Sequence, residues 1–452
     1  MVGVAGAQRQ GLLAPGYRAG MTTLPAATPD RTRAARVLDA ADLRTEHWRD
    51  LYRDLHAHPE LSGREHRTAG VLAAELRAAG LEVTEGVGGT GVVGVLRNGD
   101  GPVVMLRADM DGLPVLEDSG KPYQSRHTDT DPAGDTVPTM HACGHDMHVT
   151  ALAAAVDTLA GARDAWRGTL LVVGQPAEET ATGANAMLDD GLFTRFPKPD
   201  VALGQHVGPL PAGVANHSRE LLMAAACTLD VTIHGRGGHG SMPHVTVDPV
   251  LTAAYAVTRL QAIVSRETPS GDPVVVTVGT FHAGTKSNII PDTATFTVNL
   301  RARSDASMAR AVAAVHRVVE AESAAAGCPQ PPTIGVRENP PATVNTPALV
   351  DRVMAAQEAV MPAGAIRVAE PLMGSEDFSE FGLPKGRYAG DPVPYAFWFW
   401  GGMDPDLFPA DYTTGFSASV PGNHTAQFAP LDEPTIAAGR RLLVAAALEF
   451  LA

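Results

Sequence analysis

Between about residue 40 and residue 223, stretches with helical periodicity alternate with short, almost wholly apolar runs. Helices are expected at 43–57 and 66–79, the second stopping at Gly80 and starting after Ser62 and Glu65, which have capping-box spacing. The apolar runs have strand length and no polar face, and they lie at 92–97, 102–108, 169–174 and 200–204. Strands of this kind are buried on both faces, so the pattern predicts an α/β fold, a mostly parallel sheet between layers of helices.

The region from 224 to 337 follows a different order. Its expected elements are a strand at 227–234, a helix at 248–266, strands at 273–281 and 293–303, a helix at 305–326 and a strand at 333–336. The order β-α-β-β-α-β is that of a ferredoxin-like unit. We therefore expect 224–337 to be an inserted domain, the first domain to consist of 39–223 and 338–452, and 1–38 to be a flexible tail.

Length, charge and cysteine content narrow the class of protein. A chain of 452 residues has room for two or three domains, and its net charge of −15 argues against nucleic acid or an anionic membrane surface as a main partner. Cys143, Cys227 and Cys328 are too few and too scattered for a disulfide framework, and no apolar run approaches the ~18 residues of a membrane span. No basic segment followed by an apolar one opens the chain, so we expect a cytoplasmic protein; Met21 is an alternative start.

Polar side chains recur at the ends of the predicted strands. Three of the strands lead directly into acids or an imidazole, namely Asp109 and Asp111, Glu178 and Glu179, and His206. In open α/β sheets, ligands bind beyond the carboxyl ends of the strands, so we expect these side chains to share a site. Acidic surface loops are the alternative.

The segment HACGHDMH, residues 141–148, has the composition of a metal site. Cys143 and His145 are one residue apart and can converge on one ion, and sulfur and nitrogen ligands favour zinc or another late transition metal. A buried thiol beside helix-capping polar groups is the alternative. Of the adjacent Glu178 and Glu179, one can bind metal while its neighbour holds a water whose pKa the metal lowers. His424, in PGNHTAQF, is either a further ligand or an exposed histidine.

The inserted region contributes two further motifs. The glycine-rich turn HGRGGHGSMPH at 234–244 carries His239, and no lysine of a phosphate-binding loop follows it. Asn288, in GTKSNIIPD, lies at a strand-to-turn junction, where a purely structural turn is the alternative.

Together and in this order, these motifs resemble the metal-dependent amidohydrolase family of aminoacylases, hippurate hydrolases and auxin-conjugate hydrolases. The matching segments extend from residue 58 to 428: HPELSGRE, RADMDGLP, MHACGHDMH, GQPAEE, GQHVGPLPAG, GRGGHGSMPH, GTKSNIIPD, GSEDF and NHTAQF. The resemblance implies a catalytic α/β domain with an inserted lid that mediates dimerisation, and hydrolysis of the amide bond of a small N-acyl amino acid in a homodimer or larger homo-oligomer.

The resemblance also implies roles for individual residues. Two divalent metal ions per chain would be held, with Cys143 shared between them, by Cys143, His145, Glu179, His206 and His424. Glu178 matches the general base that moves a proton from the metal-activated water to the leaving amine. Two lid residues match groups that contact the substrate: His239, which polarises the scissile carbonyl, often from the partner subunit, and Asn288, near the substrate carboxylate.

This sequence departs from the wider peptidase superfamily at two positions. Asp109-Met-Asp111 stands where the superfamily has His-x-Asp, and Cys143 stands where relatives carry a bridging carboxylate. We therefore expect Asp109 and Asp111 to orient ligands rather than bind metal. Zinc is expected, with manganese, cobalt and nickel as alternatives. Glu376 and Asp377 of GSEDF are expected to be structural or orienting.

Other functions compete with this interpretation. A dipeptidase or carboxypeptidase would use the same site, a cysteine hydrolase would use Cys143 as nucleophile, and a catalytically silent binding protein would keep only the fold. The aromatic run 395–400 is expected to be a core strand, with a lining of the acyl pocket as the alternative.

Overall fold

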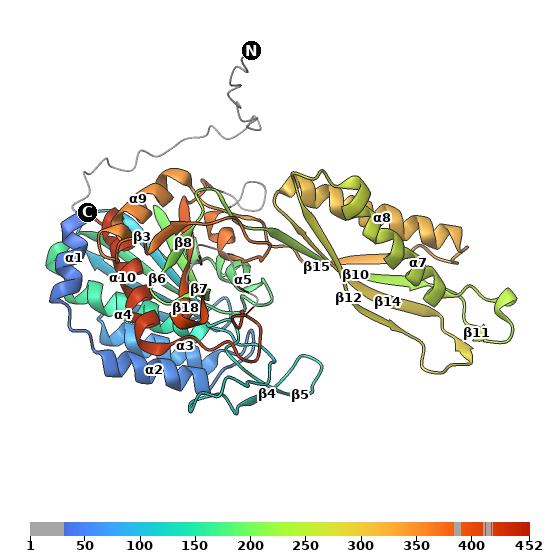
Figure 1. Cartoon of the computed structure of the whole chain (residues 1–452), viewed down its shortest axis with the longest axis horizontal. Helices are drawn as coiled ribbons and strands as arrows, with labels where there is room; N and C mark the ends of the chain where they lie inside the picture. The colour runs from blue at the N-terminus through green and yellow to red at the C-terminus, as the bar shows by residue number, and fades with distance from the viewer. Residues whose placement is uncertain (1–30, 384–389, 410–411, 413–416, 418) are drawn as a thin grey trace, which may run out of the picture.

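The computed structural model describes residues 31–383, 390–409, 412, 417 and 419–452. These residues form a broad α/β domain from which a narrower domain projects, built from the chain between β10 and β15 (Figure 1). In the described part of the chain, no helix is both long enough and apolar enough to cross a membrane.

The broad domain is built on a sheet of eight strands in the order β1-β2-β6-β3-β7-β18-β8-β17. Their bounds are Glu82–Val87, Gly91–Asn98, Gly168–Gln175, Val103–Asp109, Val201–Pro211, Tyr395–Met403, Ala215–His217 and Ile366–Val368, in that spatial order. The four central strands, β6, β3, β7 and β18, are parallel to their neighbours within this group. At the edges β1 pairs antiparallel with β2, β2 with β6 and β18 with β8, so the sheet is mixed, with a parallel centre as predicted.

The central strands are buried because both faces of the sheet are covered. Val104 and Leu106 of β3 point into a core shared with the helices of one face, while Met105 points into the core on the other face. The helices of the first face are α1 Arg31–Ala40, α2 Thr45–Ala57, α3 His66–Ala78, α4 His145–Gly161, α9 Pro347–Glu358 and α10 Asp432–Phe450. The other face carries α5 Gly183–Asp189 and α6 Leu192–Arg195. Every residue of β18 is buried, which confirms the run 395–400 as a core strand.

Two local predictions are wrong. Residues 31–38, expected to lie in a tail, belong to α1, whose Ala34, Val37 and Leu38 are buried in the core; residues 1–30 lie outside the described residues. Helix α3 begins after Glu65 as predicted, but no capping box forms. The carboxylate of Glu60 instead accepts hydrogen bonds from the amides of Arg67 and Thr68.

The projecting domain has the predicted ferredoxin-like arrangement, which confirms the fold class. Its antiparallel strands lie in the order β12-β14-β10-β15, with bounds Val274–Ala283, Thr293–Ala302, Ala225–His234 and Thr333–Glu338. Helices α7 Pro249–Ala262 and α8 Asp305–Ala325 pack on the sheet and share its core. A small ribbon of β11 Gly238–His239 and β13 Ile289–Ile290 lies at the far tip (Figure 1). The remaining short strands are β4 Thr128–Thr130, β5 Thr136–Pro138, β9 Leu221–Met223 and β16 Thr343–Val344.

The packing of α10 against α4 and the sheet depends on Gly439. A methyl group at this position would lie 2.9 Å from the Cβ of Ala151 and 3.2 Å from Cε2 of Trp400. We predict that Gly439→Ala destabilises the fold by about 1–3 kcal/mol through overpacking. Gly161→Ala is the control: at this position, the end of α4, an added methyl group would lie more than 4 Å from the described residues outside its own helix, so stability should be unchanged or rise by about 1 kcal/mol or less. Thermal unfolding of both variants measures this; equal midpoints would contradict the packing argument.

Candidate metal centre

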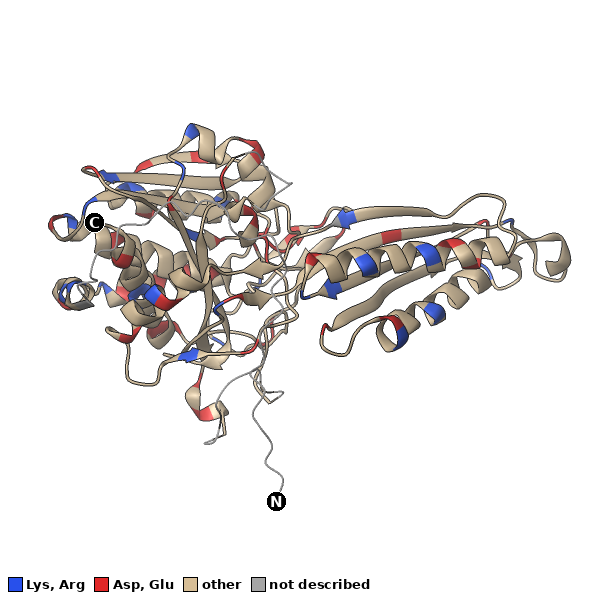
Figure 2. Cartoon of the chain, turned by 90° about the horizontal axis from the view of Figure 1, so that it is seen from above, with Lys and Arg blue, Asp and Glu red and all other residues tan. Residues whose placement is uncertain are grey.

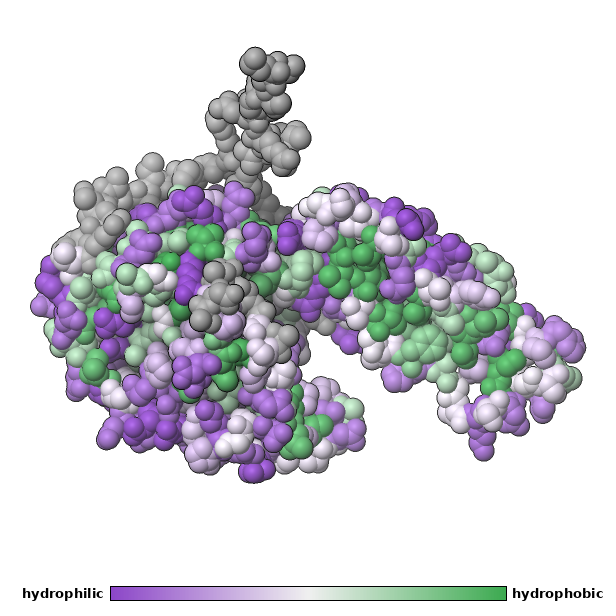
Figure 3. Space-filling model, in the orientation of Figure 1, coloured by the Kyte–Doolittle hydropathy of each residue, from purple (hydrophilic) through white to green (hydrophobic). Residues whose placement is uncertain are grey.

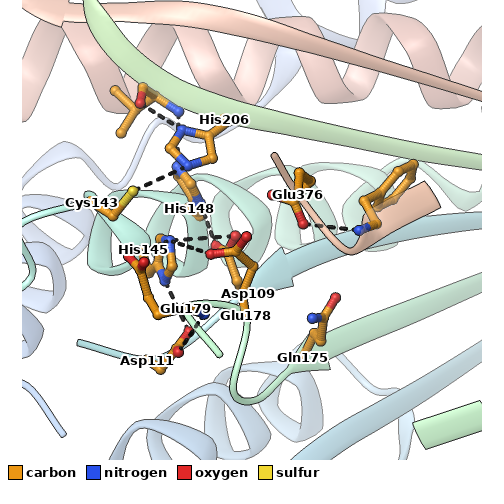
Figure 4. Close-up of polar contacts among 12 residues, drawn as sticks. Asp109, Asp111, Cys143, His145, His148, Gln175, Glu178, Glu179, His206 and Glu376 are labelled. Atoms are coloured by element: carbon orange, nitrogen blue, oxygen red, sulfur yellow. Dashed lines mark hydrogen bonds and ion pairs between the residues drawn. The ribbon is translucent and has the colours of Figure 1, made fainter. Parts of the chain in front are cut away.

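The acids and histidines predicted to share a site lie together at the carboxyl ends of the central strands (Figure 4). Asp109 is the last residue of β3, Glu178 and Glu179 follow β6, and His206 lies within β7. His145 is the first residue of α4. Because β3, β6 and β7 are parallel neighbours, segments that are distant in sequence meet at the carboxyl ends of these strands.

His145 is oriented by a carboxylate behind it. Its Nδ1 lies 3.1 Å from Oδ1 of Asp111, and its Nε2 faces inward and has no hydrogen-bond partner among the described residues. That Nε2 is 3.6 Å from Oδ2 of Asp109, 3.7 Å from Glu178 and 3.8 Å from Glu179. A carboxylate on one ring nitrogen and an open lone pair on the other is the usual arrangement of a metal-binding histidine.

The electrostatic field around this ring favours a cation. Burial lowers the pKa of His145, but the charges of Asp109 and Asp111 more than offset that effect and raise the pKa to about 10. When no metal is bound, a proton on His145 offsets part of the negative charge of these carboxylates. A divalent ion would offset more of it.

Cys143 and His206 complete one wall of the site. The Sγ of Cys143 is 3.4 Å from Nε2 of His206, whose Nδ1 donates to the carbonyl of Val207 and so leaves Nε2 unprotonated. The side-chain amide of Asn423 donates to the carbonyls of Cys143 and Val207, both at 3.2 Å, and ties the late loop to the site. Ligand atoms of Cys143, His145 and Glu179 all lie within 4.8 Å of one another.

His424 arrives on that late loop and faces the same space. Its backbone adopts the left-handed conformation, with φ of 68°, and its amide donates to the carbonyl of Ala142. The ring Nε2 is 3.3 Å from Oε2 of Glu179, and 57% of the side chain is exposed. Glu179 therefore lies between His145 and His424, and in the described part of the chain its Oε1 has no hydrogen-bond partner.

His148 belongs to the same cluster but is not available as a ligand. Its Nδ1 donates to Oδ1 of Asp109, and its Nε2 accepts the backbone amide of Val207 at 2.8 Å. Both ring nitrogens are thus engaged, and the ring holds Asp109 in place. No role was predicted for His148 from the sequence, although it lies one helical turn after His145 and so on the same face of α4.

Arg107 is the second residue that sequence reasoning missed. Its guanidinium is buried and donates to Asp109 at 2.7 Å and to Gln175 and Glu376 at 2.8 Å. Asp377 accepts from the side chain of Gln175 and the amide of Ala184. These contacts fit the structural role expected for Glu376 and Asp377. An arginine inside the apolar run of β3 was the signal that could have revealed this network.

Negative charge exceeds positive charge in this buried cluster. Among the described residues, the contacts of Arg107 and His145 include six carboxyl groups: Asp109, Glu376 and Asp377 beside Arg107, and Asp111, Glu178 and Glu179 beside His145. Burial, and then the charges of Glu376 and Glu179, raise the pKa of Glu178 well above its usual range, and burial raises the pKa of Glu376 to about 8. A site with this charge excess, an imidazole nitrogen that faces inward and a nearby thiol fits divalent cations.

The two lid residues lie elsewhere. His239 is exposed on β11, where its Nδ1 accepts from the amide and hydroxyl of Ser241, and Asn288 is exposed beside β13. Both are at the far tip of the projecting domain, away from the cluster of their own chain (Figure 1). The structure thus brings together the five predicted ligands, Glu178, Asp109 and Asp111, but not His239 and Asn288.

The sequence and the fold of this chain are similar to those of known peptidases and amide hydrolases. The model of peptidase family M20/M25/M40 matches residues 105–404. The chain is 36% identical to the hippurate hydrolase of Campylobacter jejuni, covering 72% of this chain and 82% of the relative. It is 35% identical to thermostable carboxypeptidase 2 of Saccharolobus solfataricus, covering 73% and 81%. The solved structure of Bacillus subtilis YXEP, described as a dinuclear metal binding peptidase, matches with a TM-score of 0.67 and 25% identity over 93% of this chain and 99% of that one.

The position of Cys143 allows its role as a ligand to be tested. We predict that Cys143→Ala binds less metal than the wild type, because the thiolate is the softest donor of the cluster. Cys328→Ala, which alters a half-buried thiol after α8, should retain the wild-type content. Metal per chain is measured by mass spectrometry after dialysis. Equal contents in the two variants would remove Cys143 from the ligand set.

Proposed function

The chain belongs to peptidase family M20/M25/M40, and on that premise we propose that it hydrolyses the amide bond of N-acyl amino acids with two divalent metal ions per chain. Membership makes the protein a metal-dependent hydrolase. The choice of substrate is supported by the hippurate hydrolase relative, since hippurate is an N-acyl amino acid. The observation that carries the proposal is the adjacent pair Glu178 and Glu179, set against a buried thiol and imidazoles.

In this proposal the metals are held by Cys143, His145, Glu179, His206 and His424. Thiolate and imidazole donors favour zinc, with manganese, cobalt and nickel as alternatives. When bound, the ions would polarise the scissile carbonyl and lower the pKa of water in the site. Asp111 orients His145 through its Nδ1, and His148 and Arg107 hold Asp109 beside the ligands.

Glu178 acts as the general base and then as the general acid. Its side chain is 9% exposed, and its Oε2 lies 3.7 Å from Nε2 of His145, so it faces the ligands without being needed as one. It takes the proton of the attacking water and returns it to the amine nitrogen as the carbon–nitrogen bond breaks. General acid–base catalysis of this kind contributes about 10²–10⁴-fold to the rate.

His239 and Asn288 would serve the active site of a second copy of the chain. β12 is an edge strand of the lid sheet, with an open row of backbone groups and the exposed side chains of Val275 and Phe281. Leu251 and Tyr255 of α7 are also exposed, and apolar residues gather along the lid (Figure 3). A homodimer joined through this surface would bury it and carry each lid tip toward the partner's metals.

Charge and cysteine chemistry support a small-molecule enzyme of the cytoplasm. Acidic and basic side chains both occur along α8 (Figure 2), so this helix carries no basic stripe, and the net charge of −15 disfavours nucleic acid. The cysteines of the described residues form no disulfide, as expected in a reducing compartment.

A carboxypeptidase or dipeptidase is the second candidate, favoured by the thermostable carboxypeptidase relatives. Both functions need a substrate with a free carboxylate and an amide bond. They differ in whether the acylating group is itself an amino acid. Release of amino acids from N-acetyl, N-benzoyl and N-indoleacetyl conjugates and from dipeptides, with and without chelator, separates them.

Glu178→Gln tests the assigned base. We predict that the variant keeps the wild-type metal content and loses about 10²-fold or more of kcat on the best acyl amino acid, because Gln cannot accept the proton. Steady-state kinetics and metal analysis of the same preparation measure both quantities. Turnover within a few-fold of wild type would assign the base to another group.

Complementation tests the role of the lid. Glu178→Gln and His239→Ala, each of low activity alone, are co-expressed with different tags and the mixed dimer is purified through both. If His239 acts on the partner's site, one site in the mixed dimer has both groups, and about half of the wild-type activity returns. A mixed dimer no more active than its parents would place His239 in the site of its own chain or outside catalysis.

A further inference from the structure

The turn that carries Glu178 and Glu179 has an unfavourable backbone conformation. Ala177, directly before Glu178, has φ of 50°, and Ala181 has φ of 52°. L-residues other than glycine rarely adopt this left-handed region, because Cβ approaches the neighbouring carbonyl. A turn of this kind persists only where surrounding contacts determine it, and such turns cluster at functional sites.

Hydrogen bonds within the turn fix one side of Ala177. Its carbonyl accepts from the amides of Thr182 and Gly183 and from the hydroxyl of Thr180, each at 3.2 Å. Gly183 is required there, since a Cβ would lie 1.5 Å from the carbonyl oxygen of Pro176. These bonds leave the amide of Ala177 pointing away from the turn, and a buried amide needs a partner.

That partner is Glu65, which lies 112 positions earlier in the chain. Its Oε1 accepts from the amide of Ala177 at 2.9 Å and from the amide of Gly63 at 2.6 Å, while Oε2 accepts from the hydroxyl of Thr90. The Glu65 residue is fully buried. One carboxylate therefore joins the start of α3, the β1–β2 turn and the turn that carries Glu178.

We propose that Glu65 is a positioning residue: it holds Ala177 in the left-handed conformation and thereby fixes the direction of the Glu178 side chain. The inference rests on the proposed function only for the role of Glu178. Glu179 has a separate anchor, because its own amide donates to Oδ2 of Asp111 at 3.0 Å. Loss of Glu65 should therefore disturb the base more than the metals.

The same segment, HPELSGRE, supplies a matched control. Glu60 accepts from the amides of Arg67 and Thr68 and caps α3, with no hydrogen bond to the turn at 177–183. Glu60 and Glu65 are thus neighbouring carboxylates of one motif, one serving a helix and the other the catalytic turn. Glu60→Gln keeps an accepting oxygen and should leave the turn unchanged.

The length of the side chain at position 65, rather than its charge, should determine whether the turn keeps its conformation and the enzyme its kcat. Glu65→Gln keeps a carbonyl oxygen at the same reach, whereas Glu65→Asp keeps the charge but is one methylene short of the amide of Ala177. We expect Glu65→Gln to stay within about threefold of wild-type kcat, and Glu65→Asp and Glu65→Ala to lose about tenfold or more with KM little changed. Metal content should stay at the wild-type value in all of them.

Hydrogen–deuterium exchange of the full-length zinc-loaded protein gives a readout that needs no substrate. Peptides covering 176–184 should exchange at least about tenfold faster in Glu65→Asp and Glu65→Ala than in wild type, Glu65→Gln or Glu60→Gln. Unchanged exchange in Glu65→Asp, or an equal loss of kcat in Glu60→Gln, would overturn the proposal. Should Glu65→Ala fail to fold, the Asp and Gln variants alone decide. If the wild type cleaves no acyl amino acid, the substrate proposal fails while exchange still tests Glu65.

Discussion

Uncompensated negative charge, buried where β3 and β6 end, is the constraint to which the rest of this structure responds. Carboxylates desolvated in a protein interior must be paired, protonated or bound to cations, since the cost of leaving them alone is several kcal/mol or more each. Arg107 neutralises part of the cluster, and the imidazole of His145 is held where a positive charge is strongly favoured. Divalent cations complete this balance, and the same ions supply the reactivity of the family.

The architecture keeps these charges close together. The parallel centre of the sheet brings the ends of β3, β6 and β7 side by side, and the helices on both faces exclude water from the strands. Backbone amides of the turn at 177–183 donate to Glu65 and Asp111, and the amide of Ala184, in the first turn of α5, donates to Asp377. The shape of the turn at 177–183 thus depends on buried carboxylates, one of which, Asp111, also orients the proposed metal ligand His145. The lid, a separate ferredoxin-like unit, extends away from this edge of the sheet (Figure 1).

Much of the fold was predictable from the sequence, because the periodicity of apolar residues indicates which faces of a strand or helix are buried. The runs at 102–108, 169–174 and 200–204 have no polar face and became central strands, and the lid elements follow the predicted order. β1 was not predicted, because Glu82–Val87 is an edge strand of the described sheet in which polar residues interrupt the apolar ones and half of the residues are exposed. The residues at the site were visible from composition and from motif resemblance. The role of each residue could not be predicted in the same way, because the contacts of His148 with Val207, and of Glu65 with Ala177, join positions far apart in the chain.

Anomalous diffraction from crystals of the zinc-loaded protein, recorded on both sides of the zinc absorption edge, would locate the bound ions. We expect two anomalous peaks per chain, both bordered by the side chains of Cys143, His145, Glu179, His206 and His424, with Glu178 beside them. A single peak would contradict the two-metal site. Peaks elsewhere, or none in protein shown to hydrolyse its substrate, would mean that the buried charge is balanced without metal and that the account is wrong.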